Sequence, residues 1–143
     1  MAIIDAAYLD TIATSARIVD LADDDADGEA DTTVLTTVLT AAIGRFEGAA
    51  RRGGLSLPID ETDLVASAKT YVGWYALGLL GRRRPEYRDT AGRYPYHLEF
   101  TEAEQYFGRL ATGGEILYPA REDAEVEAGL TRVVVVSRPR RGW

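Results

Sequence analysis

The chain has 143 residues, 46% of them hydrophobic, and a formal net charge of −7. That length suits one domain with a modest core, and the composition is typical of a globular protein rather than a disordered one. The absence of cysteine excludes disulfides, thiolate metal sites and a cysteine nucleophile, and the acidic charge disfavours non-specific nucleic-acid binding by the whole surface.

The first ten residues, MAIIDAAYLD, have no basic region before their apolar residues, so they are not expected to be a signal peptide. Apolar residues at helical spacing then predict helix over residues 5–21, in one piece or two, with Asp5 and Ser15 as N-caps. No apolar run approaches about 18 residues, so we expect no membrane-spanning helix and no membrane partner.

An acidic stretch, DDDADGEAD, follows over residues 23–31. It opens like an EF-hand loop, in which oxygen ligands at positions 1, 3 and 5 precede a Gly at 6 and a bidentate Glu at 12. Counting from Asp23, position 12 is Val34, which cannot ligate a metal. Two hypotheses stay open: a weak structural Ca²⁺ site, or a solvated turn in which Gly28 has a positive φ and Asp31 caps the next helix. The candidate metal ligands are Asp23, Asp25, Asp27 and Asp31. No other cofactor is expected.

A stripe of apolar residues predicts a long helix from Asp31 or Thr32 to about Arg52. Its many threonines are poor helix formers, but packing of the apolar stripe is expected to outweigh them. Gly53 and Gly54 should end this helix.

The third helix is predicted from Asp60 or Thr62 to about Leu80, after an extended linker, LSLPID. Its broad apolar face marks it as the core helix of the domain. Gly73 and Gly78 have no side chains, so another helix is expected to pack closely there.

Residues 81–96 form a loop rich in Arg and Tyr, and a last helix is predicted over about 101–110, with TEAE as its capping pattern. Arg and Tyr suit phosphate contact and base stacking, and both are enriched at protein interfaces. The acidic net charge favours an interface, or pairing with acidic stretches of the same chain, over DNA binding. The candidate partner-binding residues here are Arg82, Arg83, Arg84 and Tyr87.

The end of the chain differs in character, so we expect a helical domain over residues 1–115 and an extended C-terminal arm over 116–143. Four consecutive valines predict a β-strand over 130–138, and residues 131–143 contain four arginines and no acid. A lone strand would expose an unpaired edge, so it is expected to pair with another molecule. The candidate partner-binding residues of the arm are Arg132, Val133, Val134, Val135, Val136, Arg138, Arg140, Arg141 and Trp143.

No catalytic constellation is recognisable in the sequence. His97 is the only histidine and has no serine or cysteine motif around it, and the glycines of GRFEGAARRGG lack the pattern of a nucleotide-binding loop. We therefore predict a protein that is not an enzyme. The predicted fold is mainly α, a bundle of about four helices with an extended C-terminal arm containing a β-strand.

The order of these motifs along the chain is similar to that of a known protein family. DLADDDADGEAD is followed by the helix VLTTVLTAAIGRFEG, then LSLPID, SAKTYVGWYALGLL, RRRPEYR and finally TRVVVVSRPRRGW. This order resembles the head–tail adaptor (connector) neck proteins of tailed viruses, of the kind found in Mu-like prophages. The resemblance covers about residues 5–112 and, more loosely, the tail.

The resemblance implies a virion structural protein of the neck, between capsid and tail, that resides in the host cytoplasm during assembly. Such adaptors form a homo-oligomeric ring of about a dozen copies, a dodecamer, beneath the portal protein and join it to a downstream neck or tail protein. Genomic DNA would pass through the channel without sequence-specific binding. In this setting the strand would pair with a neighbour or the portal, the basic tail would reach an acidic portal surface, and the acidic bundle would line the channel. Two alternatives remain from the residues alone: a calcium-binding helical interaction module, and a small DNA-binding protein that uses residues 82–93.

Overall fold

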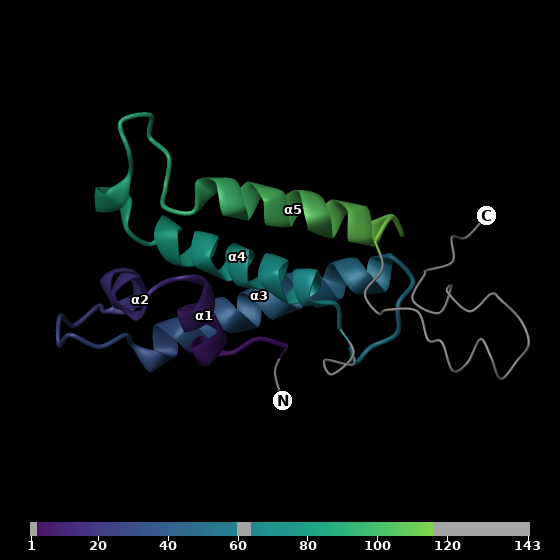
Figure 1. Cartoon of the computed structure of the whole chain (residues 1–143), viewed down its shortest axis with the longest axis horizontal. Helices are drawn as coiled ribbons and strands as arrows, with labels where there is room; N and C mark the ends of the chain where they lie inside the picture. Colours follow the sequence, from purple (N-terminus) through teal and green to yellow (C-terminus); the bar gives the residue numbers. More distant parts are fainter. Residues whose placement is uncertain (1–2, 60–63, 116–143) are drawn as a thin grey trace, which may run out of the picture.

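The computed structural model describes residues 3–59 and 64–115 (Figure 1). Those residues form α1 (Ala6–Ile12), α2 (Ser15–Ala22), α3 (Thr32–Arg52), α4 (Ala66–Arg82), the short 3-10 helix η1 (Pro85–Tyr87) and α5 (His97–Ala111). The prediction of a mainly α fold is therefore confirmed. The predicted strand and the candidate residues of the C-terminal arm lie outside the described residues.

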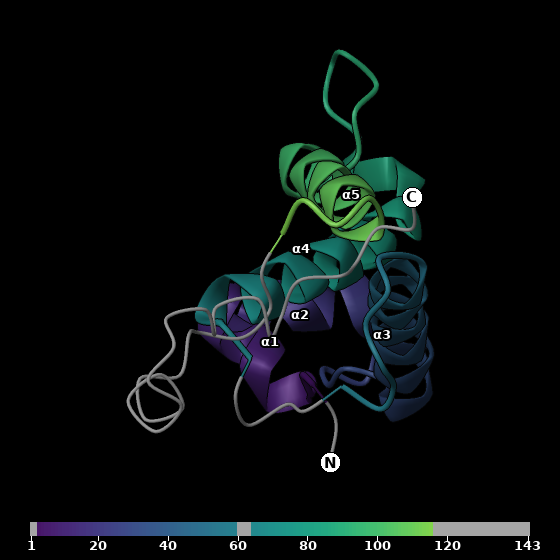
Figure 2. The same cartoon turned by 90° about the vertical axis from the view of Figure 1, so that its right-hand side faces the viewer.

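Helix α4 lies at the centre of the bundle. The long helices α3 and α5 pack against it, and α1 and α2 cover another of its sides (Figures 1 and 2). A helix enclosed in this way must be apolar on most of its faces. Its buried residues are Ala68, Val72, Gly73, Ala76, Leu77, Gly78, Leu80 and Gly81. The prediction that this segment is the core helix is confirmed.

Aromatic side chains fill the space between the three long helices. Phe46 of α3 and Phe107 of α5 are fully buried, with ring centroids 6.1 Å apart. Tyr71 of α4 stacks on Tyr106 of α5 at 4.3 Å. Burial of such large apolar surfaces is the main favourable contribution to the stability of the bundle.

Glycines allow the helices to approach closely. A methyl group added at Gly78 would lie 2.5 Å from Cβ of Phe100 in α5. One added at Gly73 would lie 2.5 Å from Cδ1 of Ile12 in α1. The predicted close packing at both glycines is confirmed, and α4 could not sit at this depth with larger residues there.

The predicted first helix is two helices. Asp5 caps α1 as expected, because its carboxylate accepts the Tyr8 N–H at 2.9 Å. Thr14, not Ser15, caps α2 by accepting the Arg17 N–H at 3.2 Å. Thr14 has the extended backbone that an N-cap requires, whereas Ser15 is already helical, so that prediction was one residue late.

Both ends of α3 agree with the sequence. Asp31 stands at the N-cap position, although its side chain makes no capping hydrogen bond, and Gly53 is the C-cap residue. Gly54 then adopts a positive φ of 91°, and the Leu55 N–H donates to the Ala50 carbonyl at 3.0 Å. This closes the last turn and satisfies a carbonyl that would otherwise lack a partner.

Two predicted helix starts were wrong. Helix α4 begins at Ala66 after an extended Val65, later than the predicted start at 60 or 62. Helix α5 begins at His97, so TEAE lies inside the helix and is not a capping pattern. The chain enters α5 through Tyr96, whose left-handed backbone has φ 61°. A non-glycine residue in that conformation gives no sequence signal of a helix start.

Candidate functional site

The acidic loop, residues 23–31, is folded by its own carboxylates. Asp23 accepts the Asp27 N–H at 3.2 Å and the Gly28 N–H at 2.9 Å. Asp27 in turn accepts the Glu29 N–H at 2.9 Å. Gly28 has φ 90°, as predicted for a tight turn at this position. These contacts are the side-chain-to-backbone bonds by which Asp residues build turns.

Three of the four candidate metal ligands lie together. Asp23, Asp25 and Asp27 each offer a carboxylate oxygen, and these oxygens all lie within 4.8 Å of one another. Asp31 is not in this group, and its carboxylate accepts the Asp24 N–H at 2.7 Å. Carboxylate oxygens can accept more than one contact, so the three residues could still ligate a hard cation such as Ca²⁺. The exposed loop has no glutamate at position 12, where Val34 stands, which favours weak binding over a sensor site.

The carboxyl groups of Asp23 and Asp25 have pKa shifts of opposite direction. The backbone N–H of Gly28 holds the pKa of Asp23 below its usual value. Desolvation, together with the negative charges of Asp27 and Asp31, raises the pKa of Asp25. The loop therefore stabilises the ionised form of Asp23 and disfavours that of Asp25, and a cation near Asp25 would favour its ionised form.

Two arginines from the end of α4 hold the acidic loop in place, and we call them the arginine clamp. Arg83 donates to the Leu21 carbonyl at 3.0 Å and contacts the Asp24 carboxylate at 2.6 Å. Arg84 donates to the Asp23 carbonyl at 2.6 Å and contacts Asp24 at 3.1 Å. The expected pairing of the arginine run with an acidic stretch is confirmed for these two residues.

The arginine run is therefore not one continuous basic surface. Arg82 points elsewhere, with its guanidinium 4.0 Å from the centre of the Phe100 ring. Arg83 and Arg84 direct their donors into the chain itself. A DNA-binding patch needs guanidinium groups that are free to contact phosphates, so this geometry disfavours the DNA-binding alternative.

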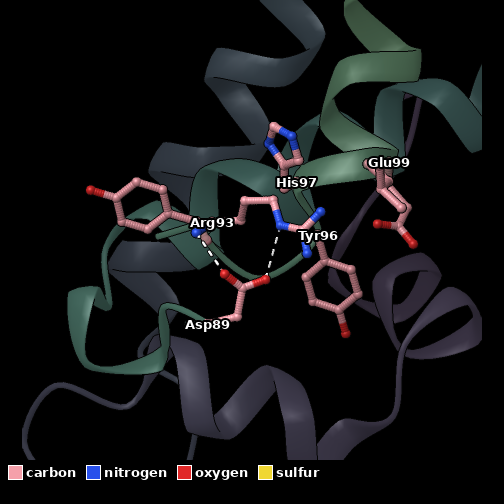
Figure 3. Close-up of a pocket in the computed structure, with 7 residues that line it drawn as sticks. Asp89, Arg93, Tyr96, His97 and Glu99 are labelled. Atoms are coloured by element: carbon pink, nitrogen blue, oxygen red, sulfur yellow. Dashed lines mark hydrogen bonds and ion pairs between the residues drawn. The ribbon is translucent and has the colours of Figure 1, made fainter. Parts of the chain in front are cut away.

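A second loop with internal hydrogen bonds comprises residues 88–96 and projects from the bundle next to α5 (Figures 1 and 2). We call this loop the finger. Asp89 organises it: its carboxylate accepts the N–H groups of Ala91 and Arg93, both at 2.9 Å, and pairs with Arg93 Nε at 3.0 Å (Figure 3). Arg88 lies over the Tyr94 ring, with its guanidinium 4.5 Å from the centroid, and donates to the Tyr94 hydroxyl. The finger is thus an ordered loop despite its exposure.

A hollow of about 210 Å³ lies where the finger meets the start of α5 (Figure 3). It is lined by Asp89, Arg93, Tyr94, Tyr96, His97, Leu98 and Glu99. The lining combines an ion pair with aromatic and apolar side chains and includes no hydrogen-bonded pair of nucleophile and base.

Tyr87 is among the partner-binding residues predicted from the sequence, whereas Asp89 and Leu98 are not. Tyr87 is 41% exposed and Leu98 65% exposed, at the two ends of the finger. Asp89 could have been found, because DTAGR has the Asp and Gly spacing of a turn. The exposure of Leu98 has no local signal, because it depends on which face of α5 meets the bundle.

No family model, curated protein or solved structure matches this chain. Within the described part of the chain, no helix has the length and apolar character needed to cross a membrane.

Proposed function

We propose that this protein is a head–tail connector of a tailed virus, a structural protein that forms a ring beneath the portal and joins the capsid to the neck or tail. The observation that carries the proposal is the order of its motifs along a mainly α chain. The D-x-D-G loop precedes α3, a Leu–Pro segment follows that helix, and RRRPEYR follows the core helix α4.

The contacts between these motifs support the proposal. The acidic loop and RRRPEYR are far apart in the sequence, yet Arg84 contacts Asp24, which lies 60 residues earlier in the chain, at 3.1 Å. The finger extends from the same end of the bundle (Figure 1). Two of the motifs behind the resemblance, the acidic loop and RRRPEYR, thus meet at one end of the bundle, whereas the Leu–Pro segment follows the opposite end of α3 (Figure 1). A surface assembled from distant parts of the chain on a helical scaffold suits an assembly protein.

The charge of the chain fits the same role. A channel for DNA must not bind the polyanion tightly, and a net charge of −7 repels it. The pairing of Arg83 and Arg84 with the acidic loop removes two cations from the surface that could otherwise hold DNA.

Quantitative mass spectrometry of purified virus particles would test this proposal, with the capsid protein as the copy-number standard. We expect about a dozen copies of this chain per particle, the number that a symmetric ring beneath the portal requires. An abundant host protein measured in the same sample would report contamination. Absence of the chain from intact particles would overturn the proposal.

One observation favours calcium binding as a second candidate: the carboxylate oxygens of Asp23, Asp25 and Asp27 lie within 4.8 Å of one another. If Ca²⁺ binds there, the free energy of unfolding should rise by about 2.7 kcal/mol at one hundred times the dissociation constant. Asp25→Asn should remove that gain, and Asp20→Asn, which deletes an equal charge from the exposed face of α2, should keep it. An unchanged melting temperature in excess Ca²⁺ would exclude this candidate.

A further inference from the structure

We propose that the finger of one copy of this chain binds the acidic loop of a second copy. The inference rests on the proposed function, because it names the contact through which copies of a connector would assemble. Four observations carry it: the order of the finger, the exposed hydrophobic residues that flank it in the chain, the complementary charge of the acidic loop, and the positions of the two surfaces on the bundle.

The finger is organised before it meets a partner. Asp89 ties its two sides together through Ala91 and Arg93, and Arg88 is held against Tyr94. A loop that is already ordered loses little conformational freedom on binding, so more of its contact energy contributes to affinity. Arg and Tyr are also the residue types most enriched among the energetically dominant positions of interfaces.

Exposed hydrophobic side chains flank the finger in the chain. Among the residues that the structure describes, the large hydrophobic side chains that are well exposed are Tyr87 and Leu98, at 41% and 65%. They lie at the two ends of the finger, and Leu98 also lines the hollow of about 210 Å³. Exposed hydrophobic side chains near arginines are typical of residues that become buried in a protein interface.

The acidic loop supplies the complementary charge. Asp25, Asp27 and Glu29 are exposed, and within residues 3–59 and 64–115 none of them pairs with a basic side chain. In the same part of the chain Arg88 makes no ion pair, because its contact is the Tyr94 ring. An arginine placed beside crowded carboxylates is attracted to them and excludes partners of the wrong charge.

The positions of the two surfaces determine the kind of assembly. Both lie at one end of the bundle, but the finger projects on the α5 side and the acidic loop on the α2–α3 side (Figures 1 and 2). A finger that binds the acidic loop of another copy leaves its own acidic loop free for a further copy. Contacts between two different surfaces repeat from copy to copy and close into a ring when the rotation allows.

Charge reversal in the full chain tests the contact, with self-association followed by sedimentation velocity at low salt. Arg88→Glu in the finger and Glu29→Arg in the acidic loop should each weaken self-association at least about tenfold, because each places like charges together. The chain with both substitutions should recover most of the association. Arg52→Glu makes the same change in charge as Arg88→Glu at the far end of α3 and should leave association unchanged. Circular dichroism would establish that every variant is folded.

Cross-linking gives an independent readout, because the chain has no cysteine of its own. We expect a disulfide-linked dimer when the single variants Ala91→Cys and Glu29→Cys are mixed under mild oxidation, and little cross-linking of either variant alone. The finger contact would be overturned if neither charge reversal changed self-association and no mixed dimer formed. It would also be overturned if the chain stayed monomeric under all these conditions. Detection of the chain in virus particles would still support the connector in those cases. A mixed dimer from a chain that is absent from particles would retain the contact and reject the connector.

Discussion

The seam between α4 and α5 and the end of the bundle that carries the acidic loop are held together in different ways. At the seam, Gly78 lets Phe100 approach the α4 backbone, and Tyr71 stacks on the buried Tyr106. At the loop end, the main cross-links are hydrogen bonds and ion pairs of partly exposed groups, with side-chain exposures of 44% for Asp24, 30% for Arg83 and 21% for Arg84.

The two regions should therefore contribute differently to the free energy of unfolding and to the response of the protein to salt and pH. Apolar burial depends little on salt or pH, whereas exposed ion pairs are screened by salt and are individually worth little. The seam should therefore set the global stability of the domain, and the loop end should be free to change its contacts without unfolding it.

The largest expected effect is at the seam. Phe107→Ala should lower the free energy of unfolding by about 3–5 kcal/mol, because it leaves a cavity among Phe46, Tyr75 and Tyr106. Tyr87→Ala, at the exposed base of the finger, should cost less than about 0.5 kcal/mol. Urea unfolding of both variants would measure the contrast, and similar losses would contradict it.

A pair of helical glycines sharpens the comparison. Gly78→Ala should cost about 1–3 kcal/mol, because the new methyl overlaps Phe100 and the two helices must separate. Gly44→Ala should stabilise the domain by up to about 1 kcal/mol, because α3 is open there and alanine favours the helix. Thermal unfolding gives the sign of each change, and a stabilising Gly78→Ala would refute the close-packed seam.

The arginine clamp should contribute much less. Asp24→Asn removes the charge that Arg83 and Arg84 contact, and we expect a loss below about 1 kcal/mol that shrinks further in about 1 M salt. The loss caused by Phe107→Ala should not shrink in salt. Asp20→Asn is the matched control for removing a negative charge nearby. A salt-independent loss of several kcal/mol would show that the clamp, like the seam, stabilises the whole domain.

The smallest effect is the titration of the acidic loop. NMR of side-chain carboxyl groups should place the midpoint of Asp23 below 3.8 and that of Asp25 above it. Because the pKa of Asp23 is lower in the folded state, Asp23 stabilises the fold at pH values above its pKa in the unfolded chain. That stabilisation is lost as the pH falls through its pKa in the folded state. Asp25 acts in the opposite sense, because desolvation and then the neighbouring negative charges disfavour its ionised form, so its protonation adds stability as pH falls through its raised pKa.

The Asp25→Asn variant tests whether the Gly28 N–H is the main cause of the lowered pKa of Asp23. In Asp25→Asn the midpoint of Asp23 should stay low, because its main cause is the backbone N–H of Gly28. A return of Asp23 to its usual value would show that the neighbouring carboxyl group controls the shift instead.

The sequence by itself determined the features that rest on local chemistry. The bounds of α3 follow from its apolar stripe, its start at Asp31 or Thr32 and the glycines at its end. The position of α4 in the core follows from its broad apolar face, and the turn at Gly28 from the glycine itself. Each of these signals lies within a few residues of the structure that it specifies.

Tertiary structure alone decided the rest. Arg83 and Asp24 are 59 residues apart in sequence and meet only because α4 packs beside α2. The start of α5 depends on the left-handed backbone of Tyr96. The preceding residue, Pro95, packs against Gly81 of α4. The exposure of Leu98 follows from the rotation of α5 on the bundle. Caps and periodicity act over single turns of the chain, whereas these features depend on how whole helices are placed against one another.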